Sequence, residues 1–310
     1  MLIRDFCHSG CFTLLSCYMR SRSGKWVLGA LLFALVGTLW SLRGMARDLW
    51  FESHRPTLPP ATSFIVQPSS STGVVPSMIT TTTPRVIPTV PFVSTTNTTV
   101  ISSRAATSSK ISTPRVVTHL PESVNLHVPF LSQAPNQVWS MPYQEACEEA
   151  SLIMVDAYLR GRTKSYPPSE GDERLLDLIA HEVSMGLSPD LTAHEIEQVV
   201  NSYYSDRRVD LMSPPSIERI RASLAAGFPV IIPASGKALG NPNFRNGGPL
   251  YHMLVIKGYL SDGRWITNDP GTRRGADYIY DQDVLMQAIH DWNGGDVTHG
   301  TPIMIVVKPK

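Results

Sequence analysis

The stretch from His54 to Ser123 places the strongest limit on how this chain can fold. It is dominated by Ser, Thr, Pro and Val, as in TGVVPSMITTTTPRVIPTVPFVSTTNTTVISS. Such a composition lacks aromatic mass and sustained helical or strand periodicity, so it cannot bury a core. Its frequent prolines also disfavour the alternative of a β-rich domain. We therefore expect residues 43–125 to form an extended, disordered stalk and residues 126–310 to form the folded domain.

An uncharged apolar segment precedes this stretch. Its 17 residues, WVLGALLFALVGTLWSL at positions 26–42, follow three cationic residues and are followed by Arg43. This length is at the short end for a membrane-spanning helix. A cleaved signal peptide is the alternative, but arginines stand where small residues would form a cleavage site. We expect an uncleaved signal anchor of a single-pass membrane protein, with residues 1–25 in the cytoplasm and the remainder outside it.

Charge and cysteine usage exclude several classes of function. The formal net charge is +1 at pH 7 and 17% of the residues are charged, so the chain offers no basic surface for nucleic acid. Three of the four cysteines, Cys7, Cys11 and Cys17, precede the apolar segment, which leaves Cys147 alone in the part expected to fold. No intramolecular disulfide can form there, and no spacing near Cys147 fits a zinc site. We expect no metal and no cofactor.

Hydrophobic periodicity predicts helices first and strands afterwards, following a short strand over 124–131. Helices are expected over residues 145–161, 173–186, 192–204 and 217–227, and one more over 281–292. Strands rich in β-branched and aromatic residues are expected over 228–235, 251–260, 264–269 and 301–309. Thr192 and Glu195 have the spacing of a capping box, and Asp281 is a candidate N-cap. The order indicates an α+β fold with an antiparallel sheet.

Cys147 falls within the first turn of the helix expected over 145–161. A lone cysteine is commonly a small buried apolar residue, but backbone N–H groups and the dipole at a helix start stabilise a thiolate, the reactive form. Glu148 and Glu149 would raise the pKa of the thiol. With about 100° of rotation per residue, both can point away from the stripe that Cys147 shares with Ala150. Cys147 is therefore a candidate nucleophile.

A nucleophilic thiol needs a base, and the base needs an orienting acceptor. His252 opens one expected strand, where its ring could lie at a sheet edge, and Asp269 ends the next strand. Adjacent antiparallel strands would place the two side by side. Either residue could be ordinary, since NDPG is a common turn and a histidine at a strand start is commonly a satisfied polar residue. Together with Cys147 at a helix start, their order favours a Cys147–His252–Asp269 triad.

Two glutamines are candidates for the oxyanion hole, which needs hydrogen-bond donors aimed at a tetrahedral intermediate. Gln133 lies in a loop ahead of the helix and could fold its amide over Cys147. Gln144 is the alternative, although its position three residues before Cys147 also suits a helix cap. The backbone N–H of Cys147 would be the second donor.

The segments VPFLSQAPNQVWSMPYQEACEEASLIMVDAYLRG and YHMLVIKGYLSDGRWITNDPGTRRG resemble the C39-like group of papain-fold cysteine peptidases. These are relatives of the domains that cut bacteriocin leaders after a double glycine, and the resemblance covers residues 128–307. It implies a papain-like fold with Cys147 as nucleophile, His252 as base and Asp269 as orienting acid. It also implies Gln133 as the oxyanion donor.

The chain departs from the leader peptidases at two positions. They place the glutamine nearer to the cysteine than in this chain, where Gln133 precedes Cys147 by 14 positions, and they tend to carry a glycine where this chain has Glu148. No GxxxxGK[ST] phosphate loop is present, so leader cleavage coupled to export is not implied.

Taken together, the sequence predicts a membrane-anchored, extracytoplasmic cysteine peptidase at a bacterial cell surface. Its partner would be a peptide or protein substrate, including one in the cell wall, and its catalytic domain would be monomeric. Two other functions remain open, which are amide transfer, with an amine resolving the acyl-enzyme, and a stalked binding module without catalysis. The loop over 238–251 could be a flap over the site or an ordinary connection.

Overall fold

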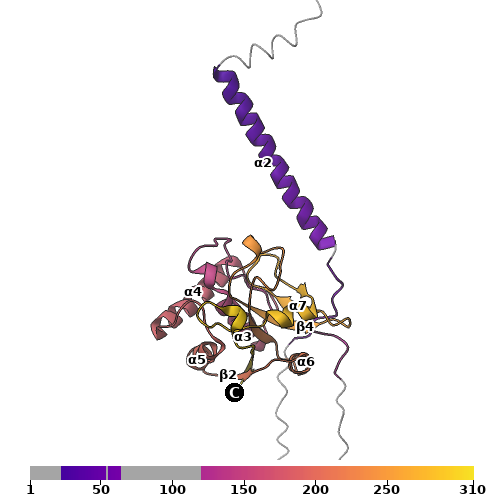
Figure 1. Ribbon diagram of the computed structural model, residues 1–310, viewed down its shortest axis with the longest axis vertical. Coiled ribbons are helices and arrows are strands. Elements are labelled where there is room, and N and C mark those ends of the chain that lie inside the picture. Colours follow the sequence, from indigo (N-terminus) through magenta and orange to yellow (C-terminus); the bar gives the residue numbers. More distant parts are fainter. Residues whose placement is uncertain (1–21, 54, 64–119) are drawn as a thin grey trace, which may run out of the picture. The chain divides into compact units, whose positions relative to one another are not determined.

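The computed structural model describes residues 22–53, 55–63 and 120–310. These residues belong to two units, Met1–Leu58 and Pro59–Lys310. In the first unit, helix α2 (Arg22–Ser53) contains the apolar segment over 26–42 but continues beyond it through Arg43 (Figure 1). No helix within the described residues is long and apolar enough to cross a membrane, so the expected anchor is not confirmed.

Order in the second unit begins upstream of Leu126, inside the segment expected to be a stalk. The N–H of Thr62 donates to the carbonyl of Asn125 at 2.8 Å, and the carbonyl of Thr62 accepts from His127 at 2.7 Å. The side-chain amide of Asn125 donates to the carbonyl of Pro59 at 2.9 Å. Residues 59–63 therefore lie against the start of the folded domain, while positions 64–119 of the expected stalk are outside the described residues.

Within the described residues of this unit, one antiparallel sheet forms the centre and five α-helices accompany it. Its strands are β1 (Val124–Asn125), β2 (Arg207–Met212), β3 (Val230–Ala234), β4 (His252–Tyr259), β5 (Trp265–Asn268), β6 (Tyr278–Tyr280) and β7 (Met304–Pro309). The helices are α3 (Cys147–Leu159), α4 (Pro168–Met185), α5 (Ala193–Tyr203), α6 (Ile217–Ala225) and α7 (Gln282–Ala288). The strand order is β2-β7-β3-β4-β5-β6, with β1 paired to β4.

The mixed helix and antiparallel-sheet architecture expected from the sequence is confirmed. The capping box of Thr192 and Glu195 is present at α5, and Asp281 caps α7 by accepting from two backbone N–H groups. Two strands were not predicted. β2 (RRVDLM) interleaves charged and apolar residues, as an edge strand with one solvated face does, and β6 has only three residues.

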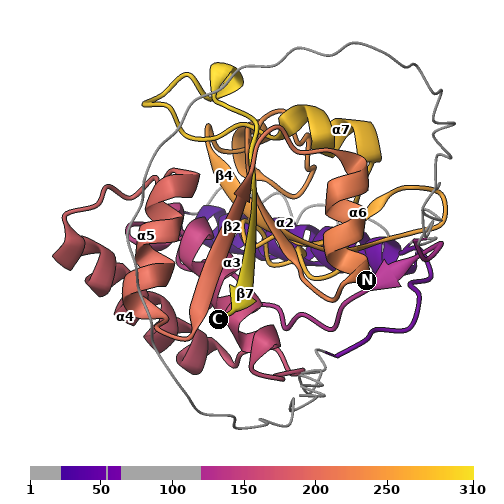
Figure 2. The same cartoon turned by 90° about the horizontal axis from the view of Figure 1, so that it is seen from below.

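Helix α3 is the most buried of the described helices. Twelve of its 13 residues are buried, because it packs against β4 on one side and α4 on another. Helices α4 and α5 lie together to one side of the strands, and α6 and α7 lie to the other (Figures 1 and 2). An apolar run such as ASLIMV suits a helix that is enclosed on all faces. The start of α3 is thereby held against the start of β4.

Candidate active site

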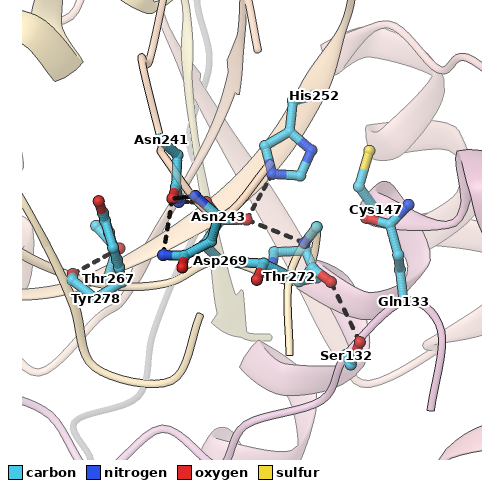
Figure 3. Close-up of polar contacts among 12 residues, drawn as sticks. Ser132, Gln133, Cys147, Asn241, Asn243, His252, Thr267, Asp269, Thr272 and Tyr278 are labelled. Atoms are coloured by element: carbon cyan, nitrogen blue, oxygen red, sulfur yellow. Dashed lines mark hydrogen bonds and ion pairs between the residues drawn. The ribbon is translucent and has the colours of Figure 1, made fainter. Parts of the chain in front are cut away.

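Cys147 is the first residue of α3, and its side chain is only 5% exposed. The backbone of Met253 in β4 hydrogen-bonds the Cys147 side chain, so the beginnings of α3 and β4 meet at the sulfur. Because Cys147 opens the helix, its own N–H has no intrahelical partner. Figure 3 shows the thiol on the side of the site toward which the ring of His252 faces.

His252 and Asp269 lie in direct contact, as the strand order predicts. His252 opens β4, Asp269 follows β5 directly, and the two strands pair antiparallel with Val255 opposite Asn268. Nε2 of His252 lies 2.8 Å from Oδ1 of Asp269. β4 is flanked by β3 and β5, so His252 stands at the end of an inner strand instead of at an edge of the sheet.

Three further donors surround the carboxylate of Asp269, which is fully buried. The amide of Asn241 donates to Oδ2 at 3.1 Å, the hydroxyl of Tyr280 donates to the same oxygen at 2.6 Å, and the N–H of Gly271 donates to Oδ1 at 3.0 Å. Burial alone would raise the pKa of Asp269, but the imidazole of His252 and these hydrogen bonds hold it below its ordinary value. The carboxylate is therefore ionised and fixed in place.

The ring of His252 is also held by shape. Phe244 packs edge-on against it, with ring centroids 5.3 Å apart. A Cβ at Gly271 would come within 2.7 Å of Cε1 of His252, so only glycine allows the turn after β5 to approach the ring this closely. Phe244 and Asn241 both belong to the loop over 238–251, which thus contributes two contacts to the site.

The contact with Asp269 fixes which nitrogen of His252 is free to act. Nε2 is engaged by the carboxylate, and the other ring nitrogen, Nδ1, lies on the side of the ring that faces Cys147 (Figure 3). An imidazole in this position can take a proton from the thiol at Nδ1 while its Nε2–H donates to Asp269. The arrangement can therefore support nucleophilic catalysis by sulfur.

The electrostatic surroundings of Cys147 differ from the sequence prediction. The thiol donates a hydrogen bond to Oε2 of Glu148 at 3.0 Å. Burial raises the pKa of Cys147 well above its ordinary value, the charges of Glu148 and Glu149 and the hydrogen bond with Glu148 raise it further, and the bond from the backbone of Met253 lowers it. The prediction that Glu148 and Glu149 point away from the cysteine is wrong for Glu148, because α3 is buried on all sides and offers its first turn no solvated face.

Three buried carboxyl groups, those of Glu148, Glu149 and Glu182, form a cluster that begins at the sulfur of Cys147. Glu148 accepts a hydrogen bond from the N–H of Leu191 at 3.3 Å, and burial raises its pKa to about 8. Burial and the facing carboxylate of Glu182 raise the pKa of Glu149 well above its ordinary value, and burial raises that of Glu182 to about 7. The carboxyl groups of Glu149 and Glu182 interact directly, and because two buried negative charges would repel each other, one of the two groups keeps a proton.

The two candidate oxyanion glutamines lie in different places. Gln133 is buried, and its amide donates to the carbonyls of Tyr143 at 3.0 Å and Gln144 at 2.9 Å, in the segment that leads into Cys147. Gln144 is exposed, and its side chain donates to Oε1 of Glu145 at 2.8 Å. Gln133 thus lies beside the segment that leads into Cys147, whereas the side chain of Gln144 is directed to the surface.

Sequence reasoning missed two residues that complete the site, Asn241 and Tyr280, and it directed Glu148 away from the sulfur that it contacts. Tyr280 could have been found from the alternation YIY, which places Tyr278 and Tyr280 on one face of a strand. Asn241 comes from an irregular loop and has no such signal. Among the described residues, no group of three or more His, Cys, Asp or Glu side chains could hold a metal ion.

Comparison with known proteins shows which family the chain belongs to. The model of the Peptidase_C39 like family matches residues 125–294, which span α3, β4 and β5 and with them Cys147, His252 and Asp269. No curated protein matches the chain.

Two solved structures are also similar to the chain. A C39-like peptidase from Bacillus anthracis has 20% identity and a TM-score of 0.41, and the match covers 61% of this chain and 100% of that one. A fragment of prointerpain A from Prevotella intermedia has 13% identity and a TM-score of 0.38, with 61% and 72% covered. The family model covers more than half of the 310 residues, and the chain therefore belongs to the Peptidase_C39 like family.

Proposed function

We propose that this protein is a cysteine peptidase that hydrolyses peptide or isopeptide bonds through a triad of Cys147, His252 and Asp269. The observation that carries the proposal is the orientation of one ring. Nε2 of His252 is fixed at 2.8 Å from Asp269, which leaves Nδ1 facing the sulfur of Cys147. Membership of a peptidase family supports the same reaction class.

The first half of the reaction forms an acyl-enzyme. Nδ1 of His252 takes the proton of the Cys147 thiol, and the thiolate attacks the carbonyl carbon of the scissile bond. The buried carboxylate of Asp269 stabilises the imidazolium and keeps its tautomer and orientation. The tetrahedral intermediate collapses when the imidazolium gives its proton to the leaving nitrogen, which departs as an amine.

The second half releases the acyl group to water. His252 takes a proton from the attacking water, and the resulting tetrahedral intermediate expels the thiolate of Cys147. The imidazolium then returns its proton to the sulfur, which restores the starting thiol and neutral imidazole. If an amine attacks in place of water, the same residues perform amide transfer. The two outcomes share every group described here and differ only in which nucleophile enters the site.

The oxyanion of each intermediate requires donors. The N–H of Cys147 is one, because the first residue of a helix has an unpaired N–H that points along the helix dipole. We assign Gln133 as the second donor. It is buried beside the segment that leads into Cys147, but its amide protons now bond to the carbonyls of Tyr143 and Gln144. Donation to an oxyanion therefore requires that one of these two bonds is exchanged.

We extend the proposal to location, with the catalytic domain outside the cytoplasm. The support is the sequence alone, in which cationic residues precede the apolar segment over 26–42. Fractionation of cells that express the full chain would test it. Protease added to intact spheroplasts should digest the domain over 120–310, and a domain that stays protected until the cells are lysed would contradict export.

Digestion of a peptide library tests the proposed activity. The full chain, its Cys147→Ala form and its His252→Ala form are each incubated with the peptides, and new termini are read by mass spectrometry. We expect cleavage by the wild type only. Equal cleavage by the Cys147→Ala form would refute the proposal, and so would a folded wild type that neither cleaves nor transfers. Products lengthened by an added amine would identify transfer.

A further inference from the structure

A carboxyl group touches the sulfur that reacts, and the proposed triad gives it no role. Oε2 of Glu148 lies 3.0 Å from Sγ of Cys147. The side chain of Glu148 is only 1% exposed, and its other oxygen, Oε1, accepts from the N–H of Leu191 at 3.3 Å. Glu148 is thus fixed at both oxygens between the nucleophile and the backbone ahead of α5. Burying a carboxyl group costs stability, and such costs are expected at functional sites.

The protonation state of Glu148 determines whether the thiol or the thiolate form of Cys147 is stabilised. An ionised carboxylate can only accept, so the sulfur must keep its proton and donate, and a thiolate beside it would be repelled. A neutral carboxyl can donate its O–H, and a thiolate is the better acceptor for it. The same 3.0 Å contact therefore stabilises either a resting thiol or a reactive thiolate. Which of the two it stabilises depends on one proton.

Four titratable groups face Glu148, whose neutral form is favoured by burial, although the hydrogen bonds from Cys147 and from the N–H of Leu191 favour the ionised form. Cys147 and Glu149 face it from α3, and Asp190 faces it from the segment before α5. Tyr251, the residue before β4, is the fourth group. Glu149 is held largely neutral by burial, as is Tyr251, whose pKa burial raises well above its ordinary value. Asp190 adds negative charge. Burial, the largest cause, raises the pKa of Glu148 to about 8.

We infer that Glu148 is a further catalytic residue, whose neutral form donates a hydrogen bond to the thiolate of Cys147 and whose ionised form returns the sulfur to a thiol. The inference rests on the proposed function, because it takes Cys147 as the nucleophile. In the active state the thiol proton is on Nδ1 of His252 and the carboxyl proton is on Glu148. When Glu148 loses its proton to solvent, the imidazolium proton returns to the sulfur, and the site as a whole has lost one proton.

The inference fixes the direction of a pH dependence. Below about pH 8 Glu148 is neutral and supports the thiolate, and above it the carboxylate opposes the thiolate. The reactivity of Cys147 should therefore fall as the pH rises from 7 to 9. An ordinary thiol shows the opposite trend, because more of it becomes thiolate as the pH rises.

Alkylation of Cys147 in the full chain measures this without any substrate. The rate of iodoacetamide labelling is followed between pH 6 and 9 by mass spectrometry of the peptide that contains Cys147. We expect the wild-type rate to fall over this range. Glu148→Gln keeps a donor that cannot ionise, so its rate should be similar to that of the wild type at pH 6 and about tenfold higher at pH 9.

Glu149→Gln is the matched control, since it makes the same chemical change one residue away from the sulfur contact. It should keep the fall at alkaline pH. Identical profiles for Glu148→Gln and Glu149→Gln would overturn the inference, because general electrostatics of buried carboxyls would then explain the effect. If Glu148→Gln does not fold, the wild-type profile decides, and a rate that rises steadily from pH 6 to 9 overturns the inference.

This result and the peptidase proposal can fail separately. Labelling reports the state of the sulfur whether or not any peptide is cleaved. A falling wild-type rate that Glu148→Gln abolishes supports the inference even if no peptide is cleaved. Peptide cleavage together with an unchanged Glu148→Gln profile would keep the peptidase and overturn the role of Glu148.

Discussion

Gly271 lies against the imidazole of His252, so closely that a Cβ there would come within 2.7 Å of Cε1 and 3.0 Å of Phe244. The turn after β5 therefore serves two purposes. The N–H of Gly271 donates to Oδ1 of Asp269, and the absence of a side chain at Gly271 leaves room for the ring of His252.

The change Gly271→Ala should lower activity far more than stability. Moving the ring of His252 by a few tenths of an ångström misaligns Nδ1 with the sulfur, and misplacement on the scale of an ångström costs about 100-fold in rate. Overpacking should reduce the free energy of unfolding by about 1–3 kcal/mol. The measurements are kcat/KM and thermal unfolding. Gly37→Ala is the control, because a Cβ at Gly37 meets no atom within 4 Å. Equal activity of both variants would show that the ring does not depend on Gly271.

The change Tyr280→Phe removes a donor at 2.6 Å from Asp269 and should raise the pKa of that carboxyl. The folded-state pKa of Asp269 is depressed, so its contribution to stability is present above its unfolded value of about 3.9 and is lost as the pH falls through the folded value. The variant should therefore unfold in acid at a higher pH than the wild type. Acid titration followed by tryptophan fluorescence measures the midpoint, and an unchanged midpoint would contradict the role given to Tyr280.

The change Asp269→Asn should reduce kcat/KM while the fold persists, because the amide keeps the size of the side chain but loses the charge that stabilises the imidazolium. Adding it to His252→Ala should cost little beyond His252→Ala alone, since residues that act as one unit are strongly non-additive. Kinetics of both single variants and the double variant decide the matter. Losses that add fully would place Asp269 outside the triad.

The change Glu182→Gln should make stability less sensitive to pH. Burial raises the folded pKa of Glu182 to about 7, so the folded state holds a proton that the unfolded chain loses above about pH 4.3. Stability therefore falls as the pH rises from about 4.3 to 7 in the wild type. At pH 8 the variant should melt higher than the wild type by on the order of 5 °C, and at pH 5 the gap should shrink. A gap that is the same at both pH values would refute the linkage.

Many of the helices and strands could be predicted from the sequence, because their hydrophobic periodicity matches the burial that the structure shows. The helix over 145–161 was expected within two residues of α3, and the order of His252 and Asp269 on neighbouring strands predicted their contact. The positions of other site residues depend on tertiary contacts, which the local sequence does not predict. Asn241 reaches Asp269 from an irregular loop, and Glu148 lies at the sulfur only because α3 is enclosed on all sides. A helical period alone cannot show that enclosure.

The start of the domain shows the same limit. Leu126 was expected to begin the ordered part, because the sequence before it lacks periodicity. In the structure the hydroxyl of Tyr259 donates to the carbonyl of Pro121 at 2.8 Å, and Val124 pairs opposite Tyr259. A chain that begins at Leu126 should therefore melt several degrees below one that begins at Leu120, as the loss of a strand and its hydrogen bonds requires. Equal melting temperatures would show that β1 contributes nothing to stability.

The central claim is that Cys147 attacks with His252 as its base, and covalent trapping tests it most directly. The full chain is incubated with an electrophilic peptide probe that acylates nucleophilic thiols, and the labelled residue and labelling rate are determined by mass spectrometry. We predict a single adduct on Cys147 within the domain over 120–310, and a rate that His252→Ala lowers by at least about 100-fold. A rate that His252→Ala leaves unchanged, or an adduct on another residue of the domain, would contradict the account.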